Sequence, residues 1–286
     1  MTTTLSLEVP GATLAYDVRG TLPPADGGPP LLLVGQPMDA GGFATLASYF
    51  GDRTVVTYDP RGLGRSTRDD GRTDHDPEQQ AEDLHALVGA LGAGPVELFA
   101  SSGGAITALA LVTAHPEDVT VLVAHEPPLL AVLPDADRAL AGERAVQAAY
   151  AAKGFGAGMA AFIALTSWQG ELPEEFTVPD PAELGLPTED DGSRDNPLLS
   201  GVSNAVTGYR PDFGAIAAAP TRVVVAAGVE SRGMLTWRAA EAAAEALGTR
   251  LAEFPSHHGG FLGDEAGYAG EPEAFATRLR EVLTAP

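Results

Sequence analysis

A serine at the junction of a predicted strand and a predicted helix has the surroundings of a nucleophile. The strand Val96–Ala100 runs directly into two serines and two glycines, and a helical pattern follows. A sharp turn of this kind holds a serine in a strained conformation with its hydroxyl exposed, and it needs small residues two positions to either side. Ser102 has Ala100 and Gly104 there, whereas Ser101 would have a phenylalanine on one side, so Ser102 is the candidate nucleophile. A phosphate-binding loop is the alternative for glycines before a helix, but no GxxxxGK[ST] pattern occurs and no lysine lies nearby.

A serine nucleophile needs a general base, and a histidine that follows a predicted strand is the candidate for this role. His258 follows the predicted strand Arg250–Phe254, in a loop that can fold back over the sheet edge toward Ser102. Its neighbour His257 is the rival, but the glycines that follow favour His258. A metal site on this pair is disfavoured, because adjacent histidines rarely chelate one ion and the HExxH spacing is absent.

Two glutamates are candidates for the acid that orients the base. Glu126 follows the predicted strand Val119–Ala124, and Glu230 follows the predicted strand Thr221–Ala227. Both keep the chain order nucleophile, acid, histidine, and a carboxylate at either strand end would fix the tautomer of the imidazole. His125, just before Glu126, is expected to line the pocket.

Acyl transfer also needs donors for the negative charge that develops on the carbonyl oxygen. The backbone N–H of Gly103, directly after Ser102, supplies one donor. The second is predicted from Gln36, in the loop after the strand Leu31–Val34, because Pro37 has no N–H.

Short apolar runs typical of buried strands alternate with helical patterns along much of the chain. An antiparallel hairpin is predicted first, at Thr4–Val9 and Thr13–Val18. The later alternation favours right-handed crossovers, so we predict an α/β fold with a mostly parallel sheet of about eight strands flanked by helices. The remaining predicted elements are strands at Leu31–Val34, Thr54–Tyr58, Val96–Ala100, Val119–Ala124, Thr221–Ala227 and Arg250–Phe254, and helices at Phe43–Phe50, Pro77–Leu91, Gly103–Ala114, Thr236–Leu247 and Glu273–Leu283.

Residues 127–211 interrupt this alternation. They are rich in alanine with helical patches, become polar over Glu171–Asn196, and contain no buried-strand pattern. A disordered linker is the alternative, but the aromatic side chains of the segment give it apolar surface to bury. The expected organisation is a core of residues 1–126 and 212–286 that carries residues 127–211 as an inserted helical cap.

Composition excludes several classes of function. The 286 residues include 17 basic and 39 acidic side chains, and the resulting charge of −22 disfavours nucleic acid as a partner. Lys153 is the only lysine, so no polybasic membrane patch exists. The absence of cysteine excludes disulfides, thiolate metal sites and cysteine nucleophiles. No apolar stretch approaches the roughly 20 residues of a membrane span, and the N-terminus lacks a signal pattern. A soluble, cytoplasmic protein with no membrane partner is predicted.

Together these segments resemble the α/β-hydrolase superfamily over most of the chain outside 127–211. Residues 59–66 match the D-x-R-G-x-G-x-S turn of the family, which is specific and mainly structural. Residues 100–104 match its nucleophile elbow, with alanine in place of the first glycine. Gln36 stands in its oxyanion loop, where valine replaces the usual histidine at position 34, and His258 with Gly-Gly-Phe after it matches the catalytic histidine loop.

The acid departs from the usual pattern of the family. Its common position corresponds to Ser231, one place beyond Glu230. Other members, such as haloalkane dehalogenases, place the acid one strand after the nucleophile, and Glu126 lies 24 residues after Ser102. The resemblance therefore favours Glu126, with Glu230 as the alternative acid. A serine at the elbow argues against dehalogenase and epoxide hydrolase activity, because those members use aspartate there.

The resemblance implies a serine hydrolase acting on a small, uncharged or hydrophobic ester or lactone through an acyl-enzyme, with no metal and no organic cofactor. Within the same fold, a perhydrolase-type or other non-hydrolytic reaction is the first alternative. A ligand-binding protein without turnover is the second, motivated by the displaced acid. The sequence predicts neither the identity of the substrate nor the oligomeric state.

Overall fold

A largely parallel sheet organises the chain. The computed structural model describes residues 2–25, 27–264 and 268–285. The strands follow the order β1-β2-β4-β3-β6-β7-β8-β9, and β5 pairs with β2 at the side of this path. Pairing is antiparallel among β1, β2, β4 and β5 and parallel from β4 to β9, which confirms the predicted mostly parallel sheet. The strands are β1 Thr2–Val9, β2 Ala12–Arg19, β3 Leu31–Gln36, β4 Val55–Tyr58, β5 Thr67–Arg68, β6 Val96–Ser102, β7 Val119–His125, β8 Arg222–Gly228 and β9 Ala252–Phe254.

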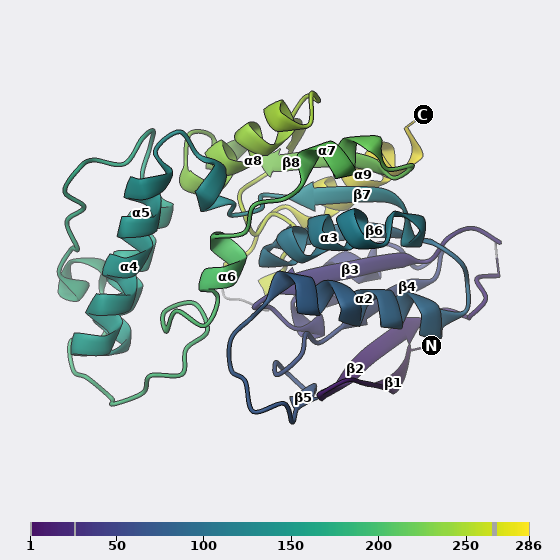
Figure 1. The fold of residues 1–286 in the computed structure, drawn as a ribbon, viewed down its shortest axis with the longest axis horizontal. Coiled ribbons are helices and arrows are strands. Elements are labelled where there is room, and N and C mark those ends of the chain that lie inside the picture. Colours follow the sequence, from purple (N-terminus) through teal and green to yellow (C-terminus); the bar gives the residue numbers. More distant parts are fainter. Residues whose placement is uncertain (1, 26, 265–267, 286) are drawn as a thin grey trace.

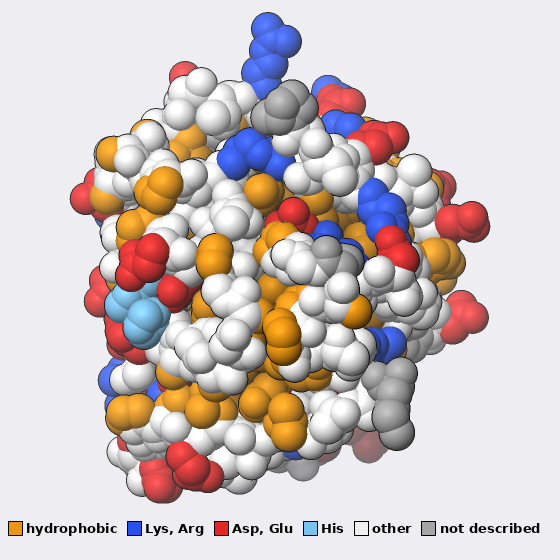
Figure 2. Space-filling view, turned by 90° about the vertical axis from the view of Figure 1, so that its right-hand side faces the viewer, with side chains coloured by type: hydrophobic (Ala, Val, Ile, Leu, Met, Phe, Trp, Pro, Cys, Tyr) orange, Lys and Arg blue, Asp and Glu red, His pale blue; other side chains and the backbone are white. Residues whose placement is uncertain are grey.

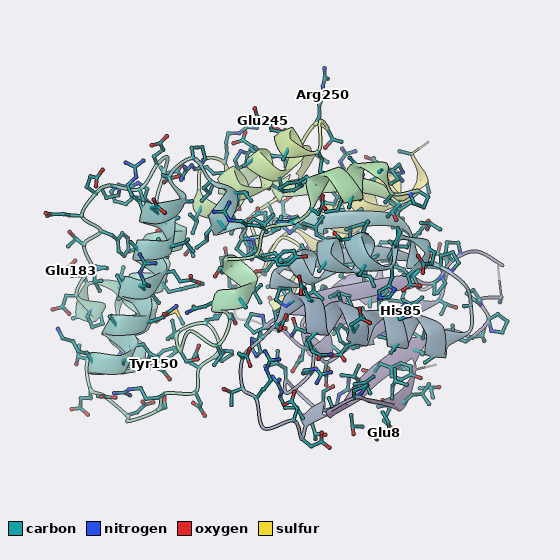
Figure 3. All side chains as sticks on the ribbon, in the orientation of Figure 1. Glu8, His85, Tyr150, Glu183, Glu245 and Arg250 are labelled. Atoms are coloured by element: carbon teal, nitrogen blue, oxygen red, sulfur yellow. The ribbon has the colours of Figure 1, made fainter. Side chains whose placement is uncertain are left out.

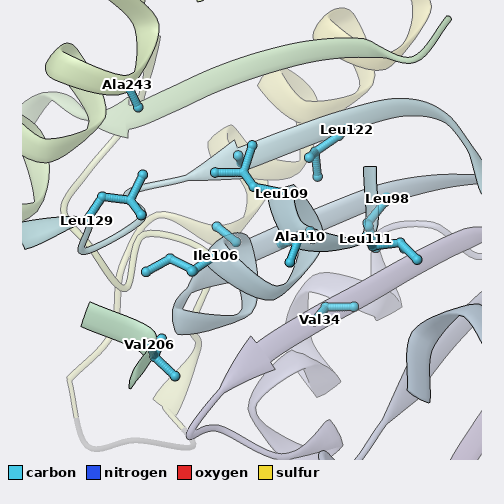
Figure 4. Close-up of a cluster of buried hydrophobic side chains, with 14 of the residues drawn as sticks. Val34, Leu98, Ile106, Leu109, Ala110, Leu111, Leu122, Leu129, Val206 and Ala243 are labelled. Atoms are coloured by element: carbon cyan, nitrogen blue, oxygen red, sulfur yellow. The ribbon is translucent and has the colours of Figure 1, made fainter. Parts of the chain in front are cut away.

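Side chains of the central strands pack into two hydrophobic cores, one on each face of the sheet, because successive residues of a strand point to opposite faces. Leu32 and Val34 of β3 pack toward α2, α3 and α8, while Leu31 and Leu33 pack toward α1 and α9. Figure 1 shows helices on both faces of the sheet, and Figure 4 shows the α3 side chains lying over the sheet. Burial on both faces explains why these strands are continuous apolar runs rather than alternating ones. The helices are α1 Ala44–Ser48, α2 Pro77–Leu91, α3 Gly103–Ala114, α8 Leu235–Ala246 and α9 Pro272–Thr284.

The start and end of α2 follow from its local sequence. The carboxylate of Asp76 accepts hydrogen bonds from the backbone N–H groups of Glu78 and Gln79, and Pro77 occupies the first helical position. Both features are typical of helix N-termini. Gly92 ends the helix in the left-handed conformation, with φ of 61°. The predicted boundaries of this helix are confirmed.

The turn at residues 59–66 braces the loop that follows β3. The buried carboxylate of Asp59 accepts hydrogen bonds from the N–H of Ala40 (2.9 Å) and of Arg65 (2.8 Å). Arg61 forms a buried, two-pronged ion pair with Asp83 of α2, at 2.5 and 2.8 Å. Ala40 begins the short 3-10 helix η1, Ala40–Phe43, just after the loop that follows Gln36, the last residue of β3. The turn therefore fixes the backbone from which one oxyanion donor is expected.

Residues 127–211 fold into helices and contain no strand. Helices α4 and α5 pack closely, since a Cβ built on Gly142 would lie 2.6 Å from Leu165, and one on Gly158 would lie 2.7 Å from Tyr150. In Figure 1 both helices lie beyond the end of the sheet toward which the parallel strands run. The elements of this segment are η3 Leu130–Val132, α4 Ala136–Lys153, α5 Phe155–Thr166, η4 Pro181–Leu184 and α6 Asn204–Thr207. A further helix, α7 (Phe213–Ala218), leads back to β8.

The distribution of charged side chains and the character of the helices match what the composition predicts. On the face turned away from α4 and α5, acidic side chains are spread around the rim with basic ones among them (Figure 2). Within the described residues, no helix has both the length and the apolar character needed to cross a membrane.

Candidate active site

Ser102 stands at the last position of β6, where the chain turns directly into α3. Its backbone has φ of 57° and ψ of −131°, a conformation that residues other than glycine rarely adopt. Such strain persists only where the surrounding structure enforces it, and it is concentrated at functional sites. The turn leaves Ser102 lining a cavity, while Ser101 is buried in the sheet. The turn therefore places the Ser102 side chain at the cavity in the strained conformation expected from the sequence.

The glycines after Ser102 are required by the close approach of β3. A Cβ on Gly104 would lie 2.7 Å from the carbonyl oxygen of Val34, and one on Gly103 would lie 2.9 Å from that of Gln36. Gln36 pairs with Ser102 in the register of β3 and β6. The two residues expected to supply oxyanion donors, Gln36 and Gly103, therefore adjoin Ser102, and Gly103 stands at the positive end of the α3 dipole.

Glu126 is fully buried and accepts three hydrogen bonds. Its Oε1 accepts from the N–H of Gly228 (2.9 Å), and its Oε2 accepts from the hydroxyl of Thr236 (2.5 Å) and bonds Nδ1 of His258 (2.7 Å). Burial by itself would raise the pKa of Glu126, but the hydrogen bond and charge of His258 outweigh it and hold this pKa well below its usual value. The site thus contains an ionised carboxylate fixed against an imidazole.

His258 lies in the loop after β9, where Ser256 adopts a positive φ of 67°. Its imidazole is 41% exposed and lines the same cavity as Ser102. Among the described residues, no hydrogen bond joins the hydroxyl of Ser102 to this imidazole. Hydrogen bonds between catalytic side chains are often long before substrate binds. The lack of a hydrogen bond here is therefore compatible with proton transfer between Ser102 and His258.

The alternative residues, His257 and Glu230, also line the cavity but make other contacts. Nδ1 of His257 accepts from the N–H of Gly259 (3.0 Å), and the ring stacks on Tyr268 at a centroid distance of 4.0 Å. Glu230 is exposed and contacts the histidine loop through its backbone, whose N–H donates to the carbonyl of Ser256. The structure therefore brings Glu126, and not Glu230, to His258.

The cavity has a volume of about 470 Å³ and is bounded both by the sheet loops and by residues 127–211. Polar residues line it near Ser102 and His258, and α4, α5 and α6 contribute both apolar side chains and the polar Glu143, Thr166 and Thr207. The apolar residues that line it include Leu130, Val146, Phe162, Leu165, Leu198, Val206, Met234, Leu235 and Leu262. A site of this size and lining suits a small, largely apolar molecule.

A chain of side-chain hydrogen bonds orients Gln36. The hydroxyl of Thr107 donates to Oε1 of Gln80 (3.1 Å), and Nε2 of Gln80 donates to Oε1 of Gln36 (3.1 Å). Nε2 of Gln36 is buried and has no partner among the described residues. Gln80 and Thr107 were not predicted as site residues, because helical spacing alone does not indicate which polar residue of a helix faces a site.

His125 does not line the cavity as expected, because it points into the core on the other side of the sheet. It is fully buried beside Phe254 and Phe275, and its Nδ1 lies 3.3 Å from the hydroxyl of Ser101. Burial lowers the pKa of His125 to about 4, although the charge of Glu126 opposes the shift. The imidazole is therefore neutral in the folded protein at neutral pH.

This neutral histidine predicts a pH-dependent stability. The unfolded chain binds a proton at His125 below about pH 6.5, while the folded protein binds it only near pH 4, so the free energy of unfolding falls as pH drops through this window. We expect a loss of about 2 kcal/mol between pH 7 and pH 5 that is absent in His125→Phe. Urea unfolding of both proteins at the two pH values measures the difference. An equal loss in both would contradict the prediction.

A group of side chains with the spacing of metal ligands lies away from the cavity. Within the described residues, the one group whose ligand atoms lie within 4.8 Å of one another is His85, His115 and Asp118. Each histidine already has a carboxylate partner, since His85 bonds Asp118 (2.7 Å) and His115 bonds Glu82 (2.9 Å). Figure 3 shows His85 on the opposite side of the molecule from Tyr150 of α4. None of these residues lines the cavity.

Comparisons with known proteins identify the family to which this fold belongs. The family model of the alpha/beta hydrolase fold matches residues 29–180. The uncharacterized hydrolase YraK of Bacillus subtilis strain 168 is 31% identical over 285 residues, which cover 97% of this chain and 95% of that protein. A thermophilic esterase from Thermogutta terrifontis superposes with a TM-score of 0.65 at 21% identity, over 99% of this chain and 98% of its own. The enol-lactonase from Burkholderia xenovorans LB400 superposes with a TM-score of 0.62 at 18% identity, over 98% and 100%.

Proposed function

Because this chain belongs to the α/β-hydrolase family, we propose that it cleaves small, uncharged or hydrophobic esters or lactones through an acyl-enzyme. One observation carries the proposal. The strained Ser102 and the His258–Glu126 pair, bonded at 2.7 Å, open onto the same largely apolar cavity. An esterase and an enol-lactonase are among the proteins that share the fold, which supports an ester or a lactone as the substrate class.

In the proposed reaction, the hydroxyl of Ser102 attacks the substrate carbonyl while Nε2 of His258 takes its proton. Glu126 holds the imidazole through Nδ1, so that Nε2 is free to accept, and its charge stabilises the imidazolium that forms. The backbone N–H groups of Gly103 and Gln36 receive the carbonyl oxygen as it becomes negative, an effect that typically contributes a few kcal/mol per donor.

Collapse of the tetrahedral intermediate breaks the bond to the alcohol oxygen, which leaves with the proton returned by His258. A lactone opens in the same step, and its alcohol stays attached to the acyl group. Water then attacks the acyl-Ser102 ester, with His258 again accepting a proton and donating it back to Ser102. We propose that residues 127–211 act as a cap that limits which substrates enter and excludes bulk water.

Labelling with a fluorophosphonate, combined with an ester and lactone panel, tests this proposal. We expect one adduct per chain on the peptide that contains Ser102, loss of labelling in Ser102→Ala, and hydrolysis without added peroxide. Mass spectrometry locates the adduct and product analysis identifies the acid. Products formed only with peroxide would favour the perhydrolase alternative, and tight binding of the panel without turnover would favour a ligand-binding protein.

A further inference from the structure

The cavity contains a carboxyl group that the proposed reaction does not use. Glu143, on α4, lines the same cavity as Ser102, although the two residues come from different parts of the chain. Around it the lining is apolar, with Val146 one turn along the helix and Phe162 and Val206 on neighbouring helices. Burial raises the pKa of Glu143, and the hydrogen bond from Thr207 opposes the shift only in part. A polar group in such surroundings needs a partner, because an unpaired one is costly.

The protein supplies one hydrogen bond to the carboxyl group of Glu143. The hydroxyl of Thr207 donates to Oε1 of Glu143 at 2.7 Å. Within the described residues, no other group donates to Glu143 and no cation forms an ion pair with it. The proton of Thr207 is already used, so whenever Glu143 is ionised its carboxylate and the threonine oxygen both present acceptors to the cavity. The complementary group is therefore a hydrogen-bond donor.

A purely structural role would be to tie α6 to α4. One turn further along α4, however, Gln147 already makes such a tie to Asn204, and neither of these residues lines the cavity. A link between the two helices therefore exists outside the cavity without a partly buried carboxylate. The position of Glu143 inside it requires another explanation, and the Gln147 tie provides a matched control.

Building on the proposed ester hydrolysis, we propose that Glu143 and Thr207 select substrates that carry a hydrogen-bond donor away from the reacting carbonyl. A hydroxyl and an ammonium group share this chemistry. The net charge of −22 favours the approach of a cation, whereas the apolar lining favours a neutral chain that ends in a hydroxyl. A site that hydrogen-bonds such a group rejects the analogue without it, since the buried acceptors stay unpaired.

Matched p-nitrophenyl esters of medium-chain acids test this inference, with ω-hydroxy, ω-ammonio or ω-methyl ends, at mildly alkaline pH and with spontaneous release subtracted. In the wild type we expect kcat/KM for one or both donor-bearing esters to exceed that of the ω-methyl ester by about tenfold or more. Glu143→Leu should remove or reverse this preference. Glu143→Gln, which keeps an acceptor but no charge, should retain a preference for the hydroxyl and lose one for the ammonium group.

The control Gln147→Leu removes the neighbouring tie without changing the cavity lining, so the preference should survive in it. Equal kcat/KM for all three ends in the wild type would overturn the inference and leave ester hydrolysis standing. So would a preference that is unchanged in both Glu143 variants, or one that Gln147→Leu abolishes equally. A wild-type protein that turns over none of these esters would instead overturn the proposed function itself.

Discussion

Replacement of Ser102 by alanine is expected to lower kcat for a small ester by roughly four to six orders of magnitude. The variant lacks the oxygen that forms the acyl-enzyme, while the cavity and the oxyanion donors stay in place. Any residual rate would come from positioning a water molecule and from those donors. Release of p-nitrophenol from p-nitrophenyl acetate, corrected for the uncatalysed rate, measures the change.

Ser101→Ala is the matched control, since it removes a hydroxyl from the adjacent position of the same strand. Ser101 is buried and contacts His125 rather than the cavity, so we expect kcat to change by less than about tenfold. If folded Ser102→Ala keeps more than a few per cent of the wild-type kcat, Ser102 is not the nucleophile. A large loss in Ser101→Ala alone would move the assignment to that residue.

The local sequence was enough to predict the elements around Ser102. Small residues on both sides of the serine, after a continuous apolar run, specify a strand that turns sharply into a helix. The sequence also predicted α2, because burial of one helix face leaves apolar residues at helical spacing. It predicted the central strands, because burial on both faces of the sheet leaves continuous apolar runs. It missed β5 (Thr67–Arg68) and α7 (Phe213–Ala218), since two or six residues are too short to show a period. It also assigned Phe43–Phe50 to one helix, where a 3-10 turn precedes the short α1.

The partners proposed for Ser102 depend on contacts between distant segments, and here the sequence left alternatives. His258 and Glu126 are 132 residues apart, and their meeting depends on how the loop after β9 folds back over β7 and β8. Thr236 shows the same limit, since its hydroxyl reaches Glu126 only because α8 packs against β8. No spacing in the sequence encodes these contacts. His125 was misplaced for a related reason, because a residue at a strand end can face either the cavity or the core.

Replacement of Glu126 by glutamine is expected to lower kcat by about two to four orders of magnitude while preserving the shape of the side chain. The carbonyl oxygen of the new amide can still accept from the N–H of Gly228, which leaves its NH2 group facing Nδ1 of His258. An amide that donates to Nδ1 forces the imidazole proton onto Nε2, the atom that must accept the proton of Ser102. The variant also loses the negative charge that stabilises the imidazolium. Burst and steady-state kinetics on p-nitrophenyl acetate measure the acylation step that this change slows.

Glu230→Gln makes the same chemical change at the rival acid and separates the two assignments. Its carboxyl is exposed and lies outside the hydrogen bonds of His258, so we expect kcat to fall by less than about tenfold. Should Glu230→Gln suffer the larger loss, the loop after β8 would have to rearrange during turnover so that Glu230 replaces Glu126 at Nδ1. That exchange would leave the buried charge of Glu126 with only Gly228 and Thr236 as partners, an arrangement disfavoured by the cost of an uncompensated carboxylate. The energetics of the buried site therefore predict that the sensitivity lies at Glu126.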